Sequence, residues 1–320
     1  MGIIVNKIEK ALDLLIIGAG PAGLTAGLYA ARLKLNTLIL EDELVGGQIR
    51  EAYVVENYPG FTSIGGSELS DRMREQSTLA GAVIDEYDTI LSVKLTNDEK
   101  IIETEKFLYK PKAVIIASGA KRRELPIPEE NKFHGNGIHY CELCDGHLYE
   151  GKHLGVVGGG SSAVGAADFL SKYAAKVTLI HRSGQLRADK KSQEDLFANK
   201  KIQVLWDSEV KSALGDKKLE AVLLENPKSK EHTELKLDGV FVYIGSIPRT
   251  ELYKDYVDVD EYGNIIAGET CETNVQGVFA AGDVRQKLFR QLTTAVSDGT
   301  TAALLAERYI LKNKKQASFV

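Results

Sequence analysis

The sequence predicts an α/β protein made of two domains, each with a parallel sheet between outer layers. At 320 residues the chain exceeds the size at which one hydrophobic core keeps growing, so two domains are expected. A unit of buried strand, glycine-rich turn, alanine-rich helix and second strand occurs twice. A further apolar strand that ends in glycine, followed by a long helix, lies near the end of the chain.

The composition is that of a globular protein, with 43% hydrophobic and 27% charged residues. Lys+Arg 40 against Asp+Glu 45 gives a net charge of −5, which does not favour a nucleic-acid partner. No apolar run approaches the roughly 18 residues of a membrane span. The run Leu14–Ile17 is too short for a signal peptide. We therefore expect a cytoplasmic protein without a membrane or nucleic-acid partner.

The first repeated unit begins with a predicted strand at Asp13–Ile17. A glycine-rich turn follows, then a helix to about Leu33 and a strand at Thr37–Leu40 that ends at Glu41. Glycines in such a turn allow a pyrophosphate to approach the backbone N–H groups at the start of the helix. The residues expected to bind a nucleotide in this turn are Gly18, Gly20, Pro21, Ala22 and Gly23.

The second unit repeats this order, with a strand at Leu154–Val157, a helix to about Ala174 and a strand at Val177–Ile180 that ends at His181. Its first glycine is as far from His181 as Gly18 is from Glu41. Two glycine motifs in the same setting and at the same spacing are a strong signal for two Rossmann-like nucleotide sites. The turn residues expected to bind the second nucleotide are Gly158, Gly160, Ser161, Ser162 and Ala163.

The residues that follow the second strand of each unit differ in charge. Glu41 can accept hydrogen bonds from ribose hydroxyls and repels a 2′-phosphate, which suits FAD or NAD. The second unit offers His181, Arg182 and Arg187 and carries no acid there, which suits the 2′-phosphate of NADP. The alternative is that the two arginines are solvated surface charges.

Of the three cysteines, Cys141 and Cys144 form a Cys-x-x-Cys pair that Asp145 follows directly. Three cysteines are too few for a secreted disulfide framework, and this spacing indicates redox chemistry or a metal. Cys271 stands alone and is expected to be a small buried hydrophobe.

A zinc site is the alternative use of the cysteine pair, since His139 and His147 flank it. The spacing lacks the long separation between ligand pairs that is typical of structural zinc. The two nucleotide units already account for a dithiol, so no metal is expected.

The last part of the chain carries a third nucleotide signal. A strand at Gly277–Ala281 leads into Gly282 and Asp283, and a helix is predicted over 290–311. The residues 312–320 are predicted to form a basic, frayed tail. Between the second unit and this signal, Asp207–Lys236 alternates short β-like runs with charged turns.

Together these motifs resemble the low-molecular-weight thioredoxin reductases over nearly the whole chain. The most specific is the Cys141-x-x-Cys144-Asp145 segment placed directly before the second nucleotide unit. The resemblance implies further FAD-binding residues beyond the first glycine turn, at Gly46, Gly47, Gln48, Asn57, Ser118, Gly119, Gly282, Asp283, Arg290 and Gln291.

The resemblance also implies a domain organisation. An FAD domain made of residues 1–118 and 247–320 is expected, with an inserted NADPH domain at 119–246 that carries the dithiol. The family further implies a homodimer.

The activity implied by the resemblance is transfer of electrons from NADPH through FAD and the cysteine pair to the disulfide of thioredoxin or a similar small protein. Cys144 is then expected to face the flavin, and Cys141 to attack the partner. Asp145 is expected to donate a proton to the departing thiolate, which requires a carboxyl kept protonated by burial. A helix cap is the alternative role for Asp145.

One residue departs from the family pattern, because Ser183 replaces an arginine at the second nucleotide site. This weakens the expected selectivity for NADPH. It also leaves open the alternative that the chain, like some relatives in the family, takes electrons from ferredoxin. A different class is a flavin-bound redox sensor or a zinc-stabilised interaction protein. A sensor would bind FAD without turning over.

Overall fold

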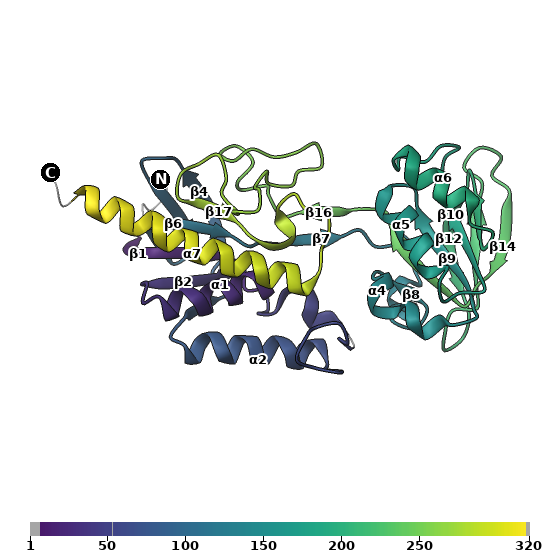
Figure 1. Ribbon diagram of the computed structural model, residues 1–320, viewed down its shortest axis with the longest axis horizontal. Helices are drawn as coiled ribbons and strands as arrows, with labels where there is room; N and C mark the ends of the chain where they lie inside the picture. The colour runs from purple at the N-terminus through teal and green to yellow at the C-terminus, as the bar shows by residue number, and fades with distance from the viewer. Residues whose placement is uncertain (1–6, 53, 318–320) are drawn as a thin grey trace, which may run out of the picture. The chain divides into compact units, whose positions relative to one another are not determined.

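The computed structural model describes residues 7–52 and 54–317 of the chain. These residues divide into two compact units, one that runs to Lys121 and resumes at Ile247, and one that comprises Arg122–Ser246 (Figure 1). Each unit contains a parallel sheet with helices on one face, so the predicted α/β class is confirmed. Two short strands, β7 (Ala120–Arg122) and β16 (Ser246–Pro248), pair where the chain passes between the units.

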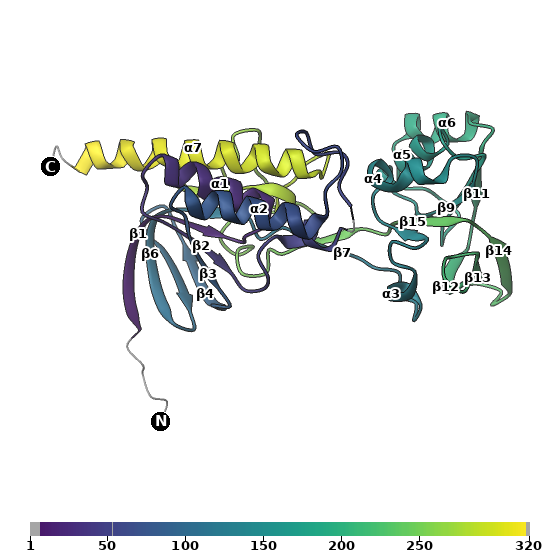
Figure 2. The ribbon, with the colours of Figure 1, turned by 90° about the horizontal axis from the view of Figure 1, so that it is seen from below.

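The first unit is built on a mixed sheet in the order β3-β2-β1-β6-β5-β4, with β17 paired to β6. Its parallel part consists of β1 (Ile8–Ile17), β2 (Thr37–Glu41), β3 (Val83–Glu86), β6 (Phe107–Ile116) and β17 (Val278–Ala280). The strands β4 (Ile90–Leu95) and β5 (Lys100–Thr104) are antiparallel to their neighbours. Figure 2 shows α1 (Pro21–Arg32), α2 (Gly66–Leu79) and α7 (Leu292–Ala317) along one face of this sheet.

The central strand β1 is buried on both faces. Leu14 and Ile16 pack with α1 and α7, whereas Leu15 and Ile17 pack with residues of 253–284 on the opposite face. Both covered faces explain why the strand is continuously apolar. The carboxyl ends of β1 and β6 lie in register, and this is where the first glycine turn begins.

The second unit has three layers (Figure 2). Its parallel sheet has the order β11-β10-β9-β15-β8 and comprises β8 (Ile138–His139), β9 (His153–Gly158), β10 (Lys176–Ile180), β11 (Ile202–Leu205) and β15 (Gly239–Tyr243). The helices α5 (Ser161–Leu170) and α6 (Lys190–Ala198) cover one face. The other face packs on an antiparallel sheet of β12 (Glu209–Leu214), β13 (Ala221–Glu225) and β14 (His232–Lys236), which confirms the predicted β-like runs.

Short elements complete both units. The first contains the 3-10 helices η1 (Gly47–Glu51) and η3 (Gly282–Val284). The second contains α3 (Glu130–Phe133), α4 (Glu142–Asp145) and η2 (Gly146–Tyr149).

Two predicted helix ends were wrong. The last helix does not end at Leu311, because α7 continues to Ala317 through lysine-rich sequence that favours helix. The remaining residues of the predicted tail, 318–320, lie outside the described residues. Helix α5 ends at Leu170 rather than near Ala174. There the Ser171 hydroxyl donates to the Asp168 carbonyl at 2.6 Å, a side-chain bond that competes with helix continuation.

Within the described ranges, no helix is both long and apolar enough to cross a membrane.

Candidate active site

The cysteine pair lies at the start of α4 in the second unit. Cys141 and Cys144 form a disulfide with their Cα atoms 5.3 Å apart, and both residues are half-buried. The backbone N–H of Cys144 donates to the Cys141 sulfur at 3.2 Å. A thiolate at Cys141 would accept this bond more strongly than a thiol does, which favours the reactive form. Cys271 is buried outside any disulfide, and burial raises the pKa of its thiol to about 11.

The first residue of α4 is held by Tyr243, the last residue of β15. The Tyr243 hydroxyl donates to the Glu142 carboxylate and accepts the Glu142 backbone N–H at 2.9 Å. Burial raises the pKa of Tyr243 far above its usual value, and the charge of Glu142 adds to the effect. Tyr243 therefore keeps its proton and fixes the start of the dithiol turn.

The last residue of α4 is Asp145, which was predicted to be a proton donor. Its side chain remains 26% exposed, and its carboxylate lies 3.2 Å from Nδ1 of His139. Asp145 also precedes η2, where its side chain makes no capping hydrogen bond. The alternative that Asp145 caps a helix is therefore wrong.

His139 is a site residue that the sequence analysis considered only as a zinc ligand. It is 4% exposed, stacks on Phe241 at 5.2 Å between ring centroids, and lies 2.6 Å from the Tyr149 hydroxyl through Nε2. Both ring nitrogens thus face protein atoms. Across the described chain, no group of three or more His, Cys, Asp or Glu side chains is arranged to hold a metal.

The first glycine turn has the geometry of a pyrophosphate cradle. Gly18 has φ +103°, and a Cβ on it would come within 2.4 Å of the Ala117 carbonyl oxygen. A Cβ on Gly23 would lie 1.8 Å from the Gly18 oxygen, so only glycine allows α1 to pack this closely. Gly20 caps α1 and faces Gly47, and a Cβ there would meet only the Gly47 Cα at 4.0 Å. The turn is therefore closely packed at Gly18 and Gly23 and open at Gly20, which leaves space for the pyrophosphate of FAD.

Glu41 stands at the end of β2 beside this turn. Its carboxylate accepts the backbone N–H groups of Ala19 at 2.7 Å and Glu43 at 3.0 Å. Burial raises the pKa of Glu41 against these two bonds. Since a carboxylate has about four acceptor positions, Glu41 can still accept ribose hydroxyls.

The Gly282–Asp283 segment contains buried polar atoms that no described residue satisfies. Asp283 Oδ1 and Arg290 Nε are both buried without a hydrogen-bond partner. Burial raises the pKa of Asp283, and the charges of Lys287 and Arg290 oppose that shift. A Cβ on Gly282 would lie 3.0 Å from the Ala22 Cβ, so this segment adjoins the first glycine turn. Buried orphan atoms beside a nucleotide turn fit a polar cofactor that supplies their partners.

The remaining residues predicted for FAD also lie in the first unit. Gln48 donates through Nε2 to the Ala120 carbonyl at 2.5 Å, and Asn57 donates to the Gln291 side chain at 3.5 Å. Ser118 donates to the Arg249 carbonyl at 2.8 Å. Three predicted glycines have positive φ, namely Gly46, Gly47 and Gly119.

The second glycine turn repeats the first. A Cβ on Gly158 would lie 2.4 Å from the Tyr243 carbonyl oxygen and 2.8 Å from the Ala163 Cβ. Gly160 caps α5 and has open space in front of it, and Ser161 and Ser162 lie exposed in the first helical turn. This turn also suits a pyrophosphate.

The three basic residues near the second turn differ in burial, since one is buried and two are exposed. His181 is buried, and its Nε2 lies 2.9 Å from both the Ser183 hydroxyl and the Gln185 carbonyl oxygen. It therefore organises the loop after β10. Arg182 and Arg187 are exposed, and the Arg187 backbone N–H donates to the Gly159 carbonyl at 2.7 Å.

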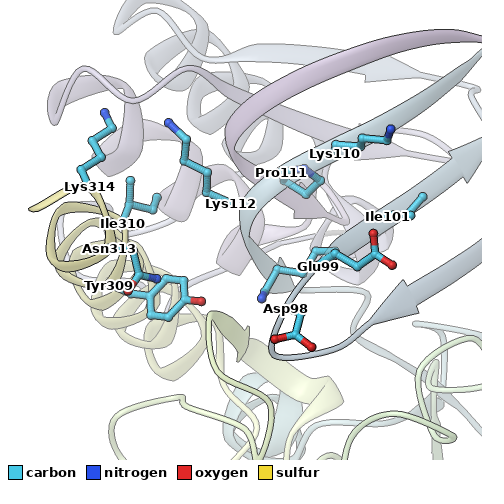
Figure 3. A pocket seen from close by; sticks show the side chains of 11 residues that line it. Asp98, Glu99, Ile101, Lys110, Pro111, Lys112, Tyr309, Ile310, Asn313 and Lys314 are labelled. Carbon is cyan, nitrogen blue, oxygen red and sulfur yellow. The ribbon is translucent and has the colours of Figure 1, made fainter. Parts of the chain in front are cut away.

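A cavity of about 400 Å³ lies elsewhere in the first unit (Figure 3). Its lining includes Lys110, Lys112 and Lys314, at the opposite ends of β6 and α7 from the predicted FAD residues. Lys110 pairs with Glu9 at 2.8 Å. The cavity is separate from both glycine turns.

Comparison with known proteins agrees with this geometry. The model of the pyridine nucleotide-disulphide oxidoreductase family matches residues 12–299, so the chain belongs to that family. The chain is 42% identical to a thioredoxin reductase of Bacillus subtilis over 303 residues, which cover 94% of this chain and 96% of the relative. It is 61% identical to a "34.2 kDa protein in rubredoxin operon" of Clostridium pasteurianum, over 95% of this chain and 99% of the relative.

Solved structures give the same result. A thioredoxin reductase from Streptococcus pyogenes is 42% identical, with a TM-score of 0.87 over 94% of this chain and 99% of its own. One from Giardia duodenalis is 33% identical, with a TM-score of 0.89 at the same coverage. Within this larger family, the chain therefore belongs to the low-molecular-weight thioredoxin reductases, as the resemblance predicted. This membership implies FAD and NADPH as cofactors.

Proposed function

We propose that this chain reduces the disulfide of thioredoxin, or of a similar small protein, through the Cys141–Cys144 pair. The observation that carries the proposal is the half-buried disulfide on α4, in a chain whose relatives are thioredoxin reductases. FAD, when bound, would supply the two-electron chemistry that links NADPH to this disulfide.

The residues of the first unit are assigned to FAD. The turn from Gly18 to Gly23 would hold the pyrophosphate, and Glu41 would accept the ribose hydroxyls. Asp283 Oδ1 and Arg290 Nε would find in the cofactor the partners that these two atoms lack among the described residues. We therefore assign the regions expected at 1–118 and 247–320 to an FAD domain.

The region expected at 119–246 is assigned to NADPH and the dithiol. Gly158 and Gly160 would admit the pyrophosphate at the start of α5. The exposed Arg182 and Arg187 would pair with the 2′-phosphate.

The dithiol works in two exchanges. Two electrons and two protons convert the Cys141–Cys144 disulfide to two thiols. The Cys141 thiolate then attacks one sulfur of the thioredoxin disulfide and displaces the other as a thiolate. Cys144 attacks the Cys141 sulfur, the second thioredoxin sulfur leaves, and each departing thiolate takes a proton. Asp145 is the proposed proton donor within the enzyme.

We further propose a cytoplasmic homodimer, which the family resemblance supports. Sedimentation should give a mass near twice the 35.0 kDa of one chain. A mass near 35.0 kDa at micromolar concentration would contradict it.

Ferredoxin as the electron source is the second candidate. A solved ferredoxin-flavin thioredoxin reductase of Clostridium acetobutylicum is 30% identical, with a TM-score of 0.52 over 95% of this chain and 99% of its own. Ser183 also replaces one cation of the family pattern. The open glycine turn and the two exposed arginines favour NADPH.

An anaerobic absorbance experiment separates the candidates. NADPH, NADH and reduced ferredoxin would each be added to a separate sample of the FAD-loaded protein. Oxidised thioredoxin would then be added to each sample. We expect NADPH to bleach the flavin, and thioredoxin to restore its colour as two thiols appear. If reduced ferredoxin bleaches the flavin and neither NADPH nor NADH does so at millimolar concentration, ferredoxin is the electron source. Bleaching without thioredoxin reduction would indicate a redox sensor.

A further inference from the structure

The dithiol turn of the second unit packs against a buried histidine whose two ring nitrogens both have protein partners. His139 lies on β8 and is 4% exposed. Its Nδ1 lies 3.2 Å from the Asp145 carboxylate, and its Nε2 lies 2.6 Å from the Tyr149 hydroxyl. A chain of three polar groups thus runs from the interior of the unit to the residue that follows Cys144.

The partners of the two ring nitrogens bear on which of them carries the proton, since Tyr149 faces Nε2 and Asp145 faces Nδ1. Burial, together with the charges of Asp145 and Asp238, raises the pKa of Tyr149 to about 12. The hydroxyl keeps its proton at neutral pH and can donate to Nε2, and we assign this direction because it leaves Nδ1–H for the Asp145 carboxyl oxygen. A neutral imidazole that accepts at Nε2 carries its proton on Nδ1, so Nδ1–H donates to Asp145.

The ring of His139 is also held rigidly. It stacks on Phe241, its register partner on β15, with 5.2 Å between ring centroids. Tyr149 meets its edge at 5.3 Å and contacts Phe241 as well. Packing therefore holds the plane of the ring, and the two polar contacts direct Nδ1 toward Asp145 within that plane.

From this geometry we infer that His139 is a positioning residue for the dithiol reaction, which orients the Asp145 carboxyl through Nδ1–H while Tyr149 sets its tautomer. Asp145 is only partly buried, so its side chain needs such a partner to hold one orientation. The inference rests on the proposed function, in which Asp145 protonates a departing thiolate.

The test uses the FAD-loaded, full-length enzyme and measures kcat and KM for thioredoxin with NADPH. His139→Ala removes the hydrogen bond and should lower kcat about tenfold or more, because a positioned general acid contributes about 10²–10⁴-fold. KM for thioredoxin should stay within about twofold, since His139 is buried.

Two further variants separate positioning from packing. His139→Asn keeps an N–H near the position of Nδ1, and should recover kcat to within about threefold of the parent enzyme. Tyr149→Phe keeps the ring contacts but removes the hydroxyl, and should give a kcat between those of His139→Ala and the parent. It also carries the test if His139→Ala does not fold.

A spectroscopic measurement tests the tautomer without turnover. Nitrogen NMR of the histidine-labelled protein should show a His139 ring protonated at Nδ1 only, with that signal shifted in Asp145→Asn. A ring protonated at Nε2 only would overturn the inference. So would full activity of His139→Ala, or a His139→Asn enzyme as slow as His139→Ala.

Asp145→Asn distinguishes the acid role proposed for Asp145 from the positioning role inferred for His139. If Asp145→Asn is as active as the parent enzyme, the proposed acid role fails and the role of His139 fails with it. If Asp145→Asn is slow while His139→Ala is fully active, the inference about His139 alone fails. If the parent enzyme does not reduce thioredoxin, the proposed function fails, and the NMR result still decides the tautomer.

Discussion

At the scale of single residues, the second nucleotide turn shows how one substitution changes a site without removing it. Ser183 stands where the family pattern has arginine, and its hydroxyl lies 2.9 Å from Nε2 of the buried His181. The side chain thus supports the loop and offers no charge to a 2′-phosphate. Arg182 and Arg187 remain exposed.

The first prediction follows from this arrangement. Ser183→Arg should raise the preference for NADPH over NADH by roughly one to two decades, since a charge-assisted contact contributes about 1.5–3 kcal/mol and about 1.4 kcal/mol is tenfold. The measurement is kcat/KM for each coenzyme. Gly184→Arg is the matched control, because it adds the same charge where a Cβ meets open space. An equal gain in both variants would indicate a general charge effect.

Residue pairs far apart in sequence are what the sequence could not predict at this scale. The Cys-x-x-Cys motif and both glycine turns could be identified because each is local. Tyr243 holds Glu142 from 101 positions away, and Phe241 stacks on His139 from the neighbouring strand β15. These contacts depend on β8 and β15 being neighbours in the sheet, and nothing local in the sequence encodes that pairing. The pairing of His139 with Phe241 is what places His139 in the site, and it becomes visible only in the structure.

At the scale of elements, both strand–turn–helix units were predictable because their apolar strands and glycines have a direct steric cause. The helix ends were less predictable, because α5 is ended by the Ser171 hydroxyl and α7 runs on through lysines. The glycines of the first turn also differ in why glycine is needed at each position. Gly23 is needed for packing of α1, whereas Gly20 leaves open space.

The second prediction uses that difference. Gly20→Val should leave the protein folded but weaken FAD retention at least tenfold, since its side chain would occupy the space for the pyrophosphate. Flavin absorbance after gel filtration measures retention, and circular dichroism checks the fold. Gly165→Val, at an exposed position of α5 with no atom near its Cβ, is the control. Full retention in Gly20→Val would show that the cofactor lies elsewhere.

A buried ion cluster links α7 to the Gly282–Asp283 segment. The Asp298 carboxylate pairs with Arg285 at 2.8 Å and Lys287 at 2.7 Å, and accepts the Gly282 backbone N–H at 2.9 Å. Burial opposes ionisation, but the hydrogen bonds from Arg285 and Lys287 outweigh it and lower the pKa of Asp298 below 3.8. The cluster thus holds the segment that carries Asp283.

The third prediction concerns this cluster. Because the pKa of Asp298 is lowered on folding, its stabilisation is present above pH 3.8 and is lost as pH falls through the lower folded value. Asp298→Asn should lose about 3–5 kcal/mol of unfolding free energy at pH 7, because two buried cations lose their partner. Urea unfolding measures the loss, and the exposed Asp255→Asn should change stability by less than about 0.5 kcal/mol. Equal losses in both variants would contradict the prediction.

At the scale of the whole molecule, one chain carries two similar nucleotide units, and the second holds the dithiol. This organisation is what the two glycine motifs and the position of Cys141 before the second motif predicted. The residues assigned to FAD and the dithiol lie in different units, so variants of α4 should leave the FAD residues of the first unit intact. Exchange with thioredoxin is therefore assigned to Cys141 and Cys144 alone.

Trapping of the mixed disulfide tests whether Cys141 and Cys144 carry out this exchange. NADPH-reduced Cys144→Ser and Cys141→Ser enzymes, both loaded with FAD, would be mixed anaerobically with oxidised thioredoxin, quenched with acid and analysed by mass spectrometry. We predict a covalent complex through Cys141 in Cys144→Ser, because the second cysteine that resolves it is absent, and none in Cys141→Ser. A complex only in Cys141→Ser would reverse the two roles. No complex in either variant, with thioredoxin still reduced, would contradict disulfide exchange through this pair.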